Sequence, residues 1–209
     1  MVDFRNAFQS QRLVYRAVED NDEDKNFVQD MIRSDPGIMA LQTADLLRPA
    51  TKDGTEAQMS WFKDCLLAVM ICIPEEDAQE DRNPQHKPKL TPIGYACLVA
   101  SNSTIRYRFH HRTAELAISI ATPFHGKGYG QETINWLLDW AFRRANLHTV
   151  SLMCVDYNVA ARKTYEKVGF VLTGRMRECD YADREWHDVL IYSMLESEWE
   201  ILRGITRKA

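Results

Sequence analysis

Short apolar runs separated by polar turns predict a series of β-strands along this chain. Runs that are rich in β-branched and aromatic residues and bounded by turn-forming residues are typical of strands. The expected strands lie at residues 13–18, 66–73, 93–100, 113–120, 149–155, 171–177 and 189–195.

Helical periodicity fills several of the intervals between these runs. It is strongest at about residues 131–145, where four apolar side chains recur on one face: Ile134, Leu137, Leu138 and Ala141. A helix at about residues 23–33 can be capped by Asn21 or Asp22. Further helices are expected at residues 159–168 and 196–203 and around residues 59–62, with a partly helical stretch near residues 39–47.

The order of these elements indicates the fold class. The first strands follow one another as an antiparallel meander, and the later ones alternate with helices. This order is typical of a mixed α/β layer fold rather than of a doubly wound parallel sheet. Residues 74–92 are polar and hold Pro84, Pro88 and Pro92, so we expect a long mobile connection there.

Composition narrows the class of protein. The chain has 209 residues, the size of one domain, and 45% of them are hydrophobic, as in a globule with a real core. No window approaches the roughly 18 apolar residues of a membrane span, and the first six residues lack the layout of a signal peptide. The net charge of −4 argues against nucleic acid as the main ligand. We therefore expect one cytoplasmic domain over residues 1–209, without a membrane or nucleic-acid partner.

The cysteines indicate no metal site and no disulfide framework. The chain has five: Cys65, Cys72, Cys97, Cys154 and Cys179. The number is odd and no C-x-x-C pair occurs. Cys72, Cys97 and Cys154 lie inside apolar runs, where we expect small buried side chains and a reducing compartment.

A glycine-rich turn joins the expected strand at residues 113–120 to the strongest helix. It reads His125, Gly126, Lys127, Gly128, Tyr129, Gly130, Gln131. Glycine lets backbone N–H groups approach a ligand closely, and a helix N-terminus adds unpaired N–H groups and a partial positive charge. This combination predicts an anion site, most naturally for phosphate.

Two familiar phosphate loops do not match this turn. A P-loop needs four residues between its first Gly and a Gly-Lys-Ser/Thr, and a dinucleotide fingerprint reads G-x-G-x-x-G. This chain reads G-x-G-x-G. A glycine-rich turn without any ligand therefore stays an alternative, as does a protein that binds ATP or NAD.

Three motifs in a fixed order carry a family resemblance. They are Ile118-Ser119-Ile120 followed by the glycine-rich turn, residues 158–170 (NVAARKTYEKVGF), and residues 175–178 (RMRE) followed by residues 186–192 (WHDVLIY). From about Ala114 to Trp199 the chain resembles the GNAT superfamily of acyl-CoA-dependent N-acetyltransferases. It is most similar to the branch that holds the ribosomal-protein alanine and polyamine acetyltransferases.

The resemblance implies a fold and a cofactor. The fold is a mixed, mostly antiparallel sheet of six to seven strands, splayed between strands 4 and 5, with helices on both faces. Acetyl-CoA is the implied co-substrate. Backbone N–H groups of the glycine-rich turn would cradle its pyrophosphate, and its peptide-like arm would pair with the backbone of residues 117–121, including Ile118, Ser119 and Ile120. No metal is implied.

One position departs from the family pattern. The motif usually begins with Gln or Arg, whereas this chain has His125. Its ring either contacts phosphate or faces solvent, and both alternatives stay open at this point.

The second motif places three residues on one helix face: Asn158, Ala161 and Tyr165. Asn158 is suited to cap the helix, and the resemblance also implies that its amide binds the pantetheine arm. Tyr165 is either a core tyrosine or, as the resemblance implies, the group beside the thioester sulfur. Its O–H, with an ordinary pKa of about 10, can serve a leaving thiolate of pKa about 8.5.

Several residues could serve as the general base that removes a proton from the acceptor amine. An attacking amine must first lose a proton, and the resemblance implies a strand carboxylate at Glu115, which acts through water. The alternative is an ordinary exposed strand carboxylate. Reserve candidates gather near the last hairpin: Asp180, Asp183, Glu185, His187 and Asp188.

The sequence predicts that the acceptor is a primary amine of a small molecule or peptide, and it does not identify that molecule. A protein N-terminus is an alternative acceptor, and a module that binds CoA without significant catalysis is an alternative function. Met39, Thr43 and Trp61 are candidate acceptor contacts, with ordinary core residues as the alternative. We expect a monomer or a homodimer.

Overall fold

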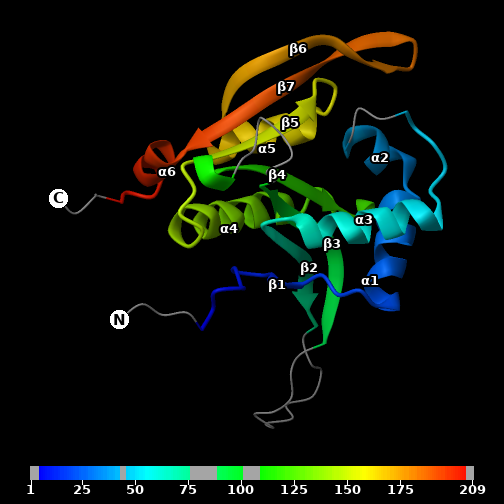
Figure 1. Cartoon of the computed structure of the whole chain (residues 1–209), viewed down its shortest axis with the longest axis horizontal. Coiled ribbons are helices and arrows are strands. Elements are labelled where there is room, and N and C mark those ends of the chain that lie inside the picture. Colours follow the sequence, from blue (N-terminus) through cyan, green and yellow to red (C-terminus); the bar gives the residue numbers. More distant parts are fainter. Residues whose placement is uncertain (1–4, 43–45, 76–88, 101–108, 206–209) are drawn as a thin grey trace.

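The strands form one sheet with the order β1-β2-β3-β4-β5-β7-β6 (Figure 1). The computed structural model describes residues 5–42, 46–75, 89–100 and 109–205. Within these residues the strands are β1 (Val14–Ala17), β2 (Leu67–Pro74), β3 (Leu90–Val99), β4 (Thr113–Ile120), β5 (Thr149–Val155), β6 (Val171–Ala182) and β7 (Glu185–Leu195).

Helices connect most of the strands. They are α1 (Asp22–Phe27), which continues as a π-helical segment (Val28–Arg33), α2 (Pro36–Gln42), α3 (Lys52–Asp64), α4 (Tyr129–Arg143), α5 (Val159–Val168) and α6 (Glu196–Leu202). Short 3₁₀ turns lie at Phe109–His111 and Thr122–Phe124. None of the helices described is long and apolar enough to cross a bilayer.

Strand pairing confirms the mixed, mostly antiparallel sheet expected from the sequence. Neighbouring strands pair antiparallel except for β4 and β5, which are parallel. That parallel pairing covers only residues 113–115 of β4 and 149–151 of β5. Beyond it the two strands diverge, which is the splayed sheet that the family resemblance implies.

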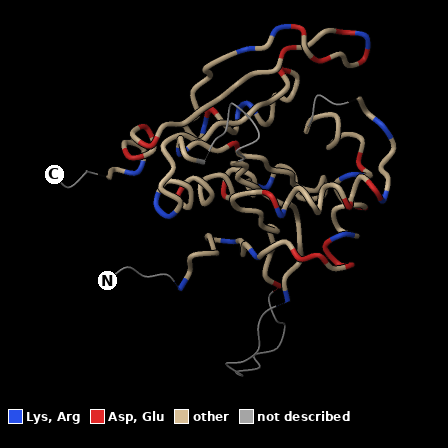
Figure 2. Tube along the Cα trace, in the orientation of Figure 1, with Lys and Arg blue, Asp and Glu red and all other residues tan. Residues whose placement is uncertain are grey.

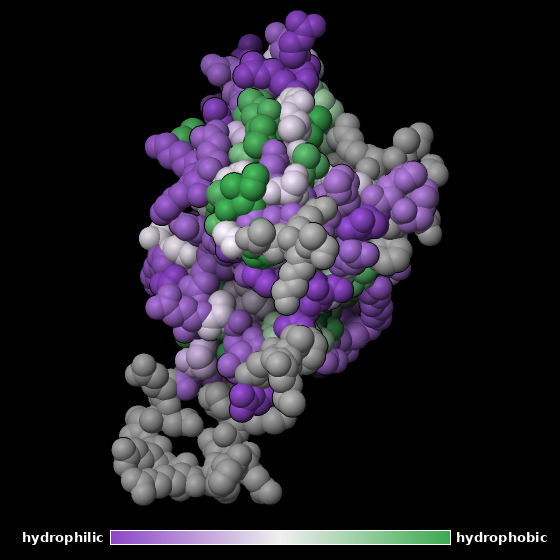
Figure 3. Space-filling model, turned by 90° about the vertical axis from the view of Figure 1, so that its left-hand side faces the viewer, coloured by the Kyte–Doolittle hydropathy of each residue, from purple (hydrophilic) through white to green (hydrophobic). Residues whose placement is uncertain are grey.

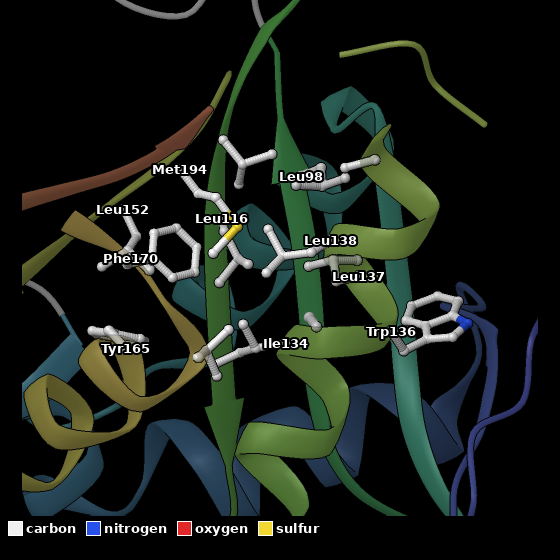
Figure 4. Packing of buried hydrophobic residues seen from close by; sticks show 14 of the residues in the cluster. Leu98, Leu116, Ile134, Trp136, Leu137, Leu138, Leu152, Tyr165, Phe170 and Met194 are labelled. Atoms are coloured by element: carbon white, nitrogen blue, oxygen red, sulfur yellow. The ribbon is translucent and has the colours of Figure 1, made fainter. Parts of the chain in front are cut away.

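Helices cover both faces of the sheet because the central strands are apolar on both sides. One core packs α4, α5 and α6 against one face, with side chains such as Leu98, Leu116 and Ile134 (Figure 4). The other core packs the helices between β1 and β2 against the opposite face, with Phe62 and Tyr95 in edge-to-face contact. Burial on both sides explains why these strands read as continuous apolar runs.

The helices before β2 deviate from the prediction in detail. Asn21 caps α1 through its side chain, which accepts a hydrogen bond from the Asp24 N–H. The expected helix then widens into a π-helical segment at Val28. The proline at residue 36 ends this helix but also begins α2, because the Asp35 carboxylate accepts hydrogen bonds from the backbone of Gly37 and Ile38.

Two boundaries were wrong. The expected loop at residues 74–92 ends early, because β3 begins at Leu90 and Pro92 lies opposite Cys72 beside a β-bulge. The mobility expected for this loop falls on residues 76–88, which lie outside the described residues. The last two strands extend beyond the predicted ends into a long hairpin, where Tyr181 pairs with Trp186. Its polar, exposed residues carry no apolar run.

Candidate active site

The turn between β4 and α4 is shaped by glycines in the left-handed region. Gly126 has φ +73° and Gly128 has φ +81°, conformations that L side chains rarely adopt. Gly128 is the N-cap of α4, while Gly130 lies in its first turn with open space around it. We call residues 126–131 the glycine turn.

Six consecutive backbone N–H groups of the glycine turn donate no hydrogen bond to any residue that the structure describes. They belong to Gly126, Lys127, Gly128, Tyr129, Gly130 and Gln131, and the first helical bond of α4 is donated by Glu132. Because N–H groups at the start of a 15-residue helix carry partial positive charge, the turn is suited to bind an anion.

Two cations lie beside this turn. Arg12 donates to the carbonyl of Lys127 at 3.0 Å and stacks over the Tyr129 ring at 4.7 Å. Lys127 lies 5.4 Å above the ring of Phe124. Sequence reasoning missed Arg12, which is 115 residues from Lys127 along the chain. No spacing pattern predicts such a contact.

His125 turns its ring back toward the strand. Its Nε2 lies 2.7 Å from the carbonyl oxygen of Ile120, so the ring fixes the exit of β4. His125 is nevertheless an exposed residue, so the contact with the strand accompanies the solvent-facing alternative that the sequence left open.

The backbone of β4 changes partner along its length. Two contacts show which residues face β5: the Ala114 carbonyl accepts from Ser151 Oγ at 3.4 Å, and the Ile120 carbonyl accepts from His125. Backbone groups alternate sides along a strand, so Leu116 and Ile118 also face β5. Since the pairing of β4 with β5 ends at Glu115 and Ser151, the N–H and C=O groups of Leu116 and Ile118 face the gap between the two strands. Ser119 pairs with β3 instead, and its side chain is buried.

The start of α5 is fixed by Asn158. Its side-chain oxygen accepts a hydrogen bond from the Ala161 N–H at 3.1 Å, which confirms the predicted helix cap. Gly169 ends the helix in the left-handed conformation. These two ends fix the rotation of α5 and therefore the direction of Tyr165.

Tyr165 lies in the core on the same side of the sheet as α4 (Figure 4). Its ring is 6.0 Å from that of Tyr192 and 6.1 Å from that of Phe170. Burial raises the pKa of the Tyr165 hydroxyl well above its ordinary value, and the neighbouring Cys154 adds to this. The hydroxyl is therefore neutral at physiological pH, and it donates no hydrogen bond to the described residues. A neutral phenol of this kind is a hydrogen-bond donor more than a source of a freely transferred proton.

Glu115 lies at the point where β4 and β5 separate. It is half-buried and opposes Val99 and Ser151 in the two neighbouring strands. By alternation its side chain shares a face with Ala117, opposite to the face of Leu116. The structure thus places Glu115 and Tyr165 on opposite sides of the splayed strands.

Three of the reserve candidates near the last hairpin have structural partners. Asp188 pairs with Arg175 at 3.0 Å, and Asp180 accepts a hydrogen bond from Tyr157 at 2.9 Å. His187 lies 3.2 Å from Asp156. Asp183 adopts a positive φ in the turn, and Glu185 begins β7. These contacts support the hairpin, whereas Glu115 lies where β4 and β5 separate.

A cavity of about 750 Å³ opens on the Ala117 face of β4. Met39 and Trp61, two candidate acceptor contacts, line it together with Tyr95. Thr43, the third candidate, lies outside the described residues. Among the residues that can be placed, no group of three His, Cys, Asp or Glu side chains could hold a metal ion.

Comparison with known proteins identifies related chains. A family model described as an acetyltransferase (GNAT) domain matches residues 12–171. An N-acetyltransferase of Bacillus subtilis (strain 168) named YnaD is 28% identical over 141 residues, which cover 63% of this chain and 82% of that protein. The spermidine N(1)-acetyltransferase of Vibrio cholerae is 33% identical over 102 residues, which cover 49% of this chain and 59% of that protein.

A solved structure is similar over almost its whole length. The spermidine N-acetyltransferase from Vibrio cholerae, in complex with CoA and spermine, matches with a TM-score of 0.68 and 25% identity. The match covers 90% of this chain and 98% of that chain.

Proposed function

The chain belongs to the GNAT family of acetyltransferases, and we propose that its glycine turn binds the pyrophosphate of acetyl-CoA. As a member of this family it is an N-acetyltransferase that moves the acetyl group of acetyl-CoA to an amine. The observation that carries the proposal is the run of six backbone N–H groups without a partner among the described residues, placed beside the open part of β4. A pyrophosphate offers the acceptor oxygens and negative charge that such a turn lacks.

The remaining cofactor contacts follow the gap between β4 and β5. The peptide-like arm of the cofactor would pair with the backbone of Ile118, as an added strand. Ser119 and Ile120 fix the position of this backbone, Ser119 through its pairing with β3 and Ile120 through its bond to His125. Asn158 keeps its amide nitrogen for the arm while its oxygen caps α5 beside Ala161.

The chemistry needs two reactants held together and two proton-handling groups. Acetyl-CoA supplies the thioester. Glu115, acting through water, would take a proton from the acceptor amine, whose ordinary pKa of about 10 keeps it protonated at neutral pH. The second proton, which the nitrogen loses once the carbon–nitrogen bond has formed, would leave through the same water. The Leu116 and Ile118 N–H groups would polarise the carbonyl, and Tyr165 would donate a hydrogen bond to the sulfur as the carbon–sulfur bond breaks. Because the pKa of Tyr165 is raised, this donation stabilises the thiolate without complete proton transfer.

The acceptor in this proposal is a primary amine of a small molecule or a peptide, with a protein N-terminus as the alternative. The assignment of residues 1–209 to one domain stays a prediction. The oligomeric state, a monomer or a homodimer, also stays a prediction.

Apolar side chains gather over the upper part of the face drawn in Figure 3. Among the exposed apolar residues of the chain are Val171 and Leu172 of β6 and Ile201 and Leu202 of α6.

The experiment is calorimetry with acetyl-CoA, ATP and NAD, followed by an assay of CoA release with a panel of amines. Tight binding of acetyl-CoA alone, with CoA release that depends on an amine, is the expected result. Binding of acetyl-CoA without release by any amine would favour a CoA-binding module. Tight binding of ATP or NAD with no heat from acetyl-CoA would contradict the proposal.

A further inference from the structure

The cavity on the Ala117 face of β4 lacks, among the described residues, the acidic side chains that a site for a polycation would need. Its lining residues are Arg33, Met39, Gln42, Leu46, Leu47, Arg48, Pro49, Thr51, Gln58, Trp61, Tyr95 and Ala117. No Asp or Glu of the described residues is among them, whereas two are arginines. Its volume of about 750 Å³ lies in the range of roughly 300–1,000 Å³ that is usual for small-molecule sites.

The positive charge is local and does not follow from the whole chain. The net charge is −4, and basic and acidic residues alternate with one another along the chain trace (Figure 2). An acidic chain that lines one cavity with arginine and apolar side chains favours an anionic, partly apolar ligand there.

Arg33 is the half-buried arginine of the cavity lining, whereas Arg48 is exposed. Arg33 ends the π-helical segment, and its Nε is buried without a hydrogen-bond partner among the described residues. It forms no ion pair with any residue that can be placed. Arg33 as a whole is half-buried and lines the cavity, so its guanidinium donors are suited to a ligand anion there.

Gly54 makes room for this guanidinium. A Cβ added at Gly54 would lie 2.5 Å from Arg33 Nη2. Gly54 stands in the first turn of α3, and a side chain there would require the Arg33 guanidinium to shift. The chain therefore keeps its smallest residue beside Arg33.

The cavity adjoins the proposed reaction centre. Ala117 contributes to its lining and shares a strand face with Glu115, two residues away. A ligand in the cavity can therefore present an amine to Glu115 while another of its groups contacts Arg33.

We propose that Arg33 binds a carboxylate of the acceptor, and that the acceptor is an amino acid or short peptide with an apolar side chain rather than a polyamine. Met39, Leu46 and Trp61 would contact the apolar part, and the guanidinium would hold the carboxylate. This inference rests on the proposed function, because it assigns the acceptor of the same reaction.

The test measures CoA release with a panel of acceptors in which each amino acid is matched by an amide that differs from it only in the carboxylate. The panel holds apolar L-amino acids, the corresponding amino-acid amides, short peptides with Asp or Glu at the second position, and spermidine. The free amino acids and the acidic peptides separate the two sources of the carboxylate. Arg33→Gln and Arg33→Lys are compared with Lys63→Gln, which removes one positive charge from α3 outside the cavity.

We expect a carboxylate acceptor to exceed both its amide and spermidine in kcat/KM. In Arg33→Gln its KM should rise roughly 10- to 100-fold, as for the loss of a charge-assisted contact, with acetyl-CoA affinity unchanged. Arg33→Lys should recover part of this loss, and Lys63→Gln should match the wild type.

A purely structural role of Arg33 would change thermal stability but leave the ratio of acid to amide unchanged, and would overturn the inference. Higher kcat/KM with spermidine than with every carboxylate acceptor would also overturn it, as would acetyl-CoA binding without turnover of any carboxylate acceptor. Failure to bind acetyl-CoA at all would instead contradict the proposed function.

Discussion

Arg12 and Glu132 form a salt bridge of 2.7 Å between Nε and Oε2, although 120 residues separate them in the chain. The backbone N–H of Arg12 and the hydroxyl of Ser10 donate to the same carboxylate, each at 2.7 Å. These bonds tie the segment before β1 to the first turn of α4. Because Arg12 also bonds the Lys127 carbonyl, the glycine turn is supported from outside the sheet.

Loss of Arg12 should weaken cofactor binding without changing the chemistry. In Arg12→Gln we expect the acetyl-CoA Kd to rise roughly three- to tenfold, the size of one partly exposed charged interaction. The kcat at saturating acetyl-CoA should stay near the wild-type value. Calorimetry and steady-state kinetics measure the two quantities, with Lys163→Gln on the exposed face of α5 as the charge-matched control. An unchanged Kd would remove Arg12 from the support of this turn.

The same pair predicts a pH dependence of stability. Burial acts to raise the pKa of Glu132, but hydrogen bonds from Ser10 and Arg12 outweigh it and lower that pKa below its ordinary value. The carboxylate therefore stabilises the folded chain above the unfolded pKa of about 4.3, and this stabilisation is lost as the pH falls through the folded pKa.

Thermal unfolding between pH 7 and pH 3 measures this effect. Wild type should exceed Glu132→Gln in Tm at neutral pH, and the difference should shrink once the pH falls below about 4.3. A difference that is constant over the whole range would show that the charge of Glu132 contributes nothing.

Removal of the Tyr165 hydroxyl should slow turnover. In Tyr165→Phe we expect kcat to fall from severalfold to roughly a few hundredfold, because the leaving thiolate loses its hydrogen-bond donor. The Kd for acetyl-CoA should change little. Tyr192→Phe is the matched control, since the Tyr192 hydroxyl contacts Glu166 at 3.1 Å and has no role in the proposed chemistry. Equal kcat values in Tyr165→Phe and wild type would exclude the donor role.

Replacement of Glu115 tests the base. In Glu115→Gln we expect kcat/KM for the amine to fall roughly 10²-fold, with the remaining activity rising toward high pH as more of the free amine is present. Rate profiles from pH 6 to pH 10 measure this. A Glu115→Gln profile that overlays that of the wild type would show that Glu115 is an ordinary strand carboxylate.

Much of the fold could be predicted because its elements carry strong local patterns. The bounds of β4, β5 and α5 agree with the sequence prediction, since each combines an apolar pattern with a clear stop such as Gly169. The long hairpin of β6 and β7 was underestimated because its outer residues, such as Tyr181 and Trp186, are exposed and alternate little.

The parts of the site that the sequence did not predict depend on contacts between distant segments. Arg12 reaches Lys127 only after the sheet has formed, and Arg33 approaches Gly54 only when the helices pack. His125 bonds the carbonyl of Ile120 because of the conformation of the short turn between them, which side-chain chemistry alone does not specify.

The most direct test of the central claim is the acetyl-CoA Kd of two glycine variants, measured by calorimetry. Gly128→Val places a branched side chain at φ +81°, beside the unpaired N–H groups, and should raise the Kd at least roughly tenfold. Gly204→Val is the matched control, because Gly204 also has a positive φ, +62°, and open space around it but lies after α6, outside the glycine turn, so this variant should keep the wild-type Kd. A folded Gly128→Val protein with wild-type affinity for acetyl-CoA would contradict the assignment of this turn as the cofactor site.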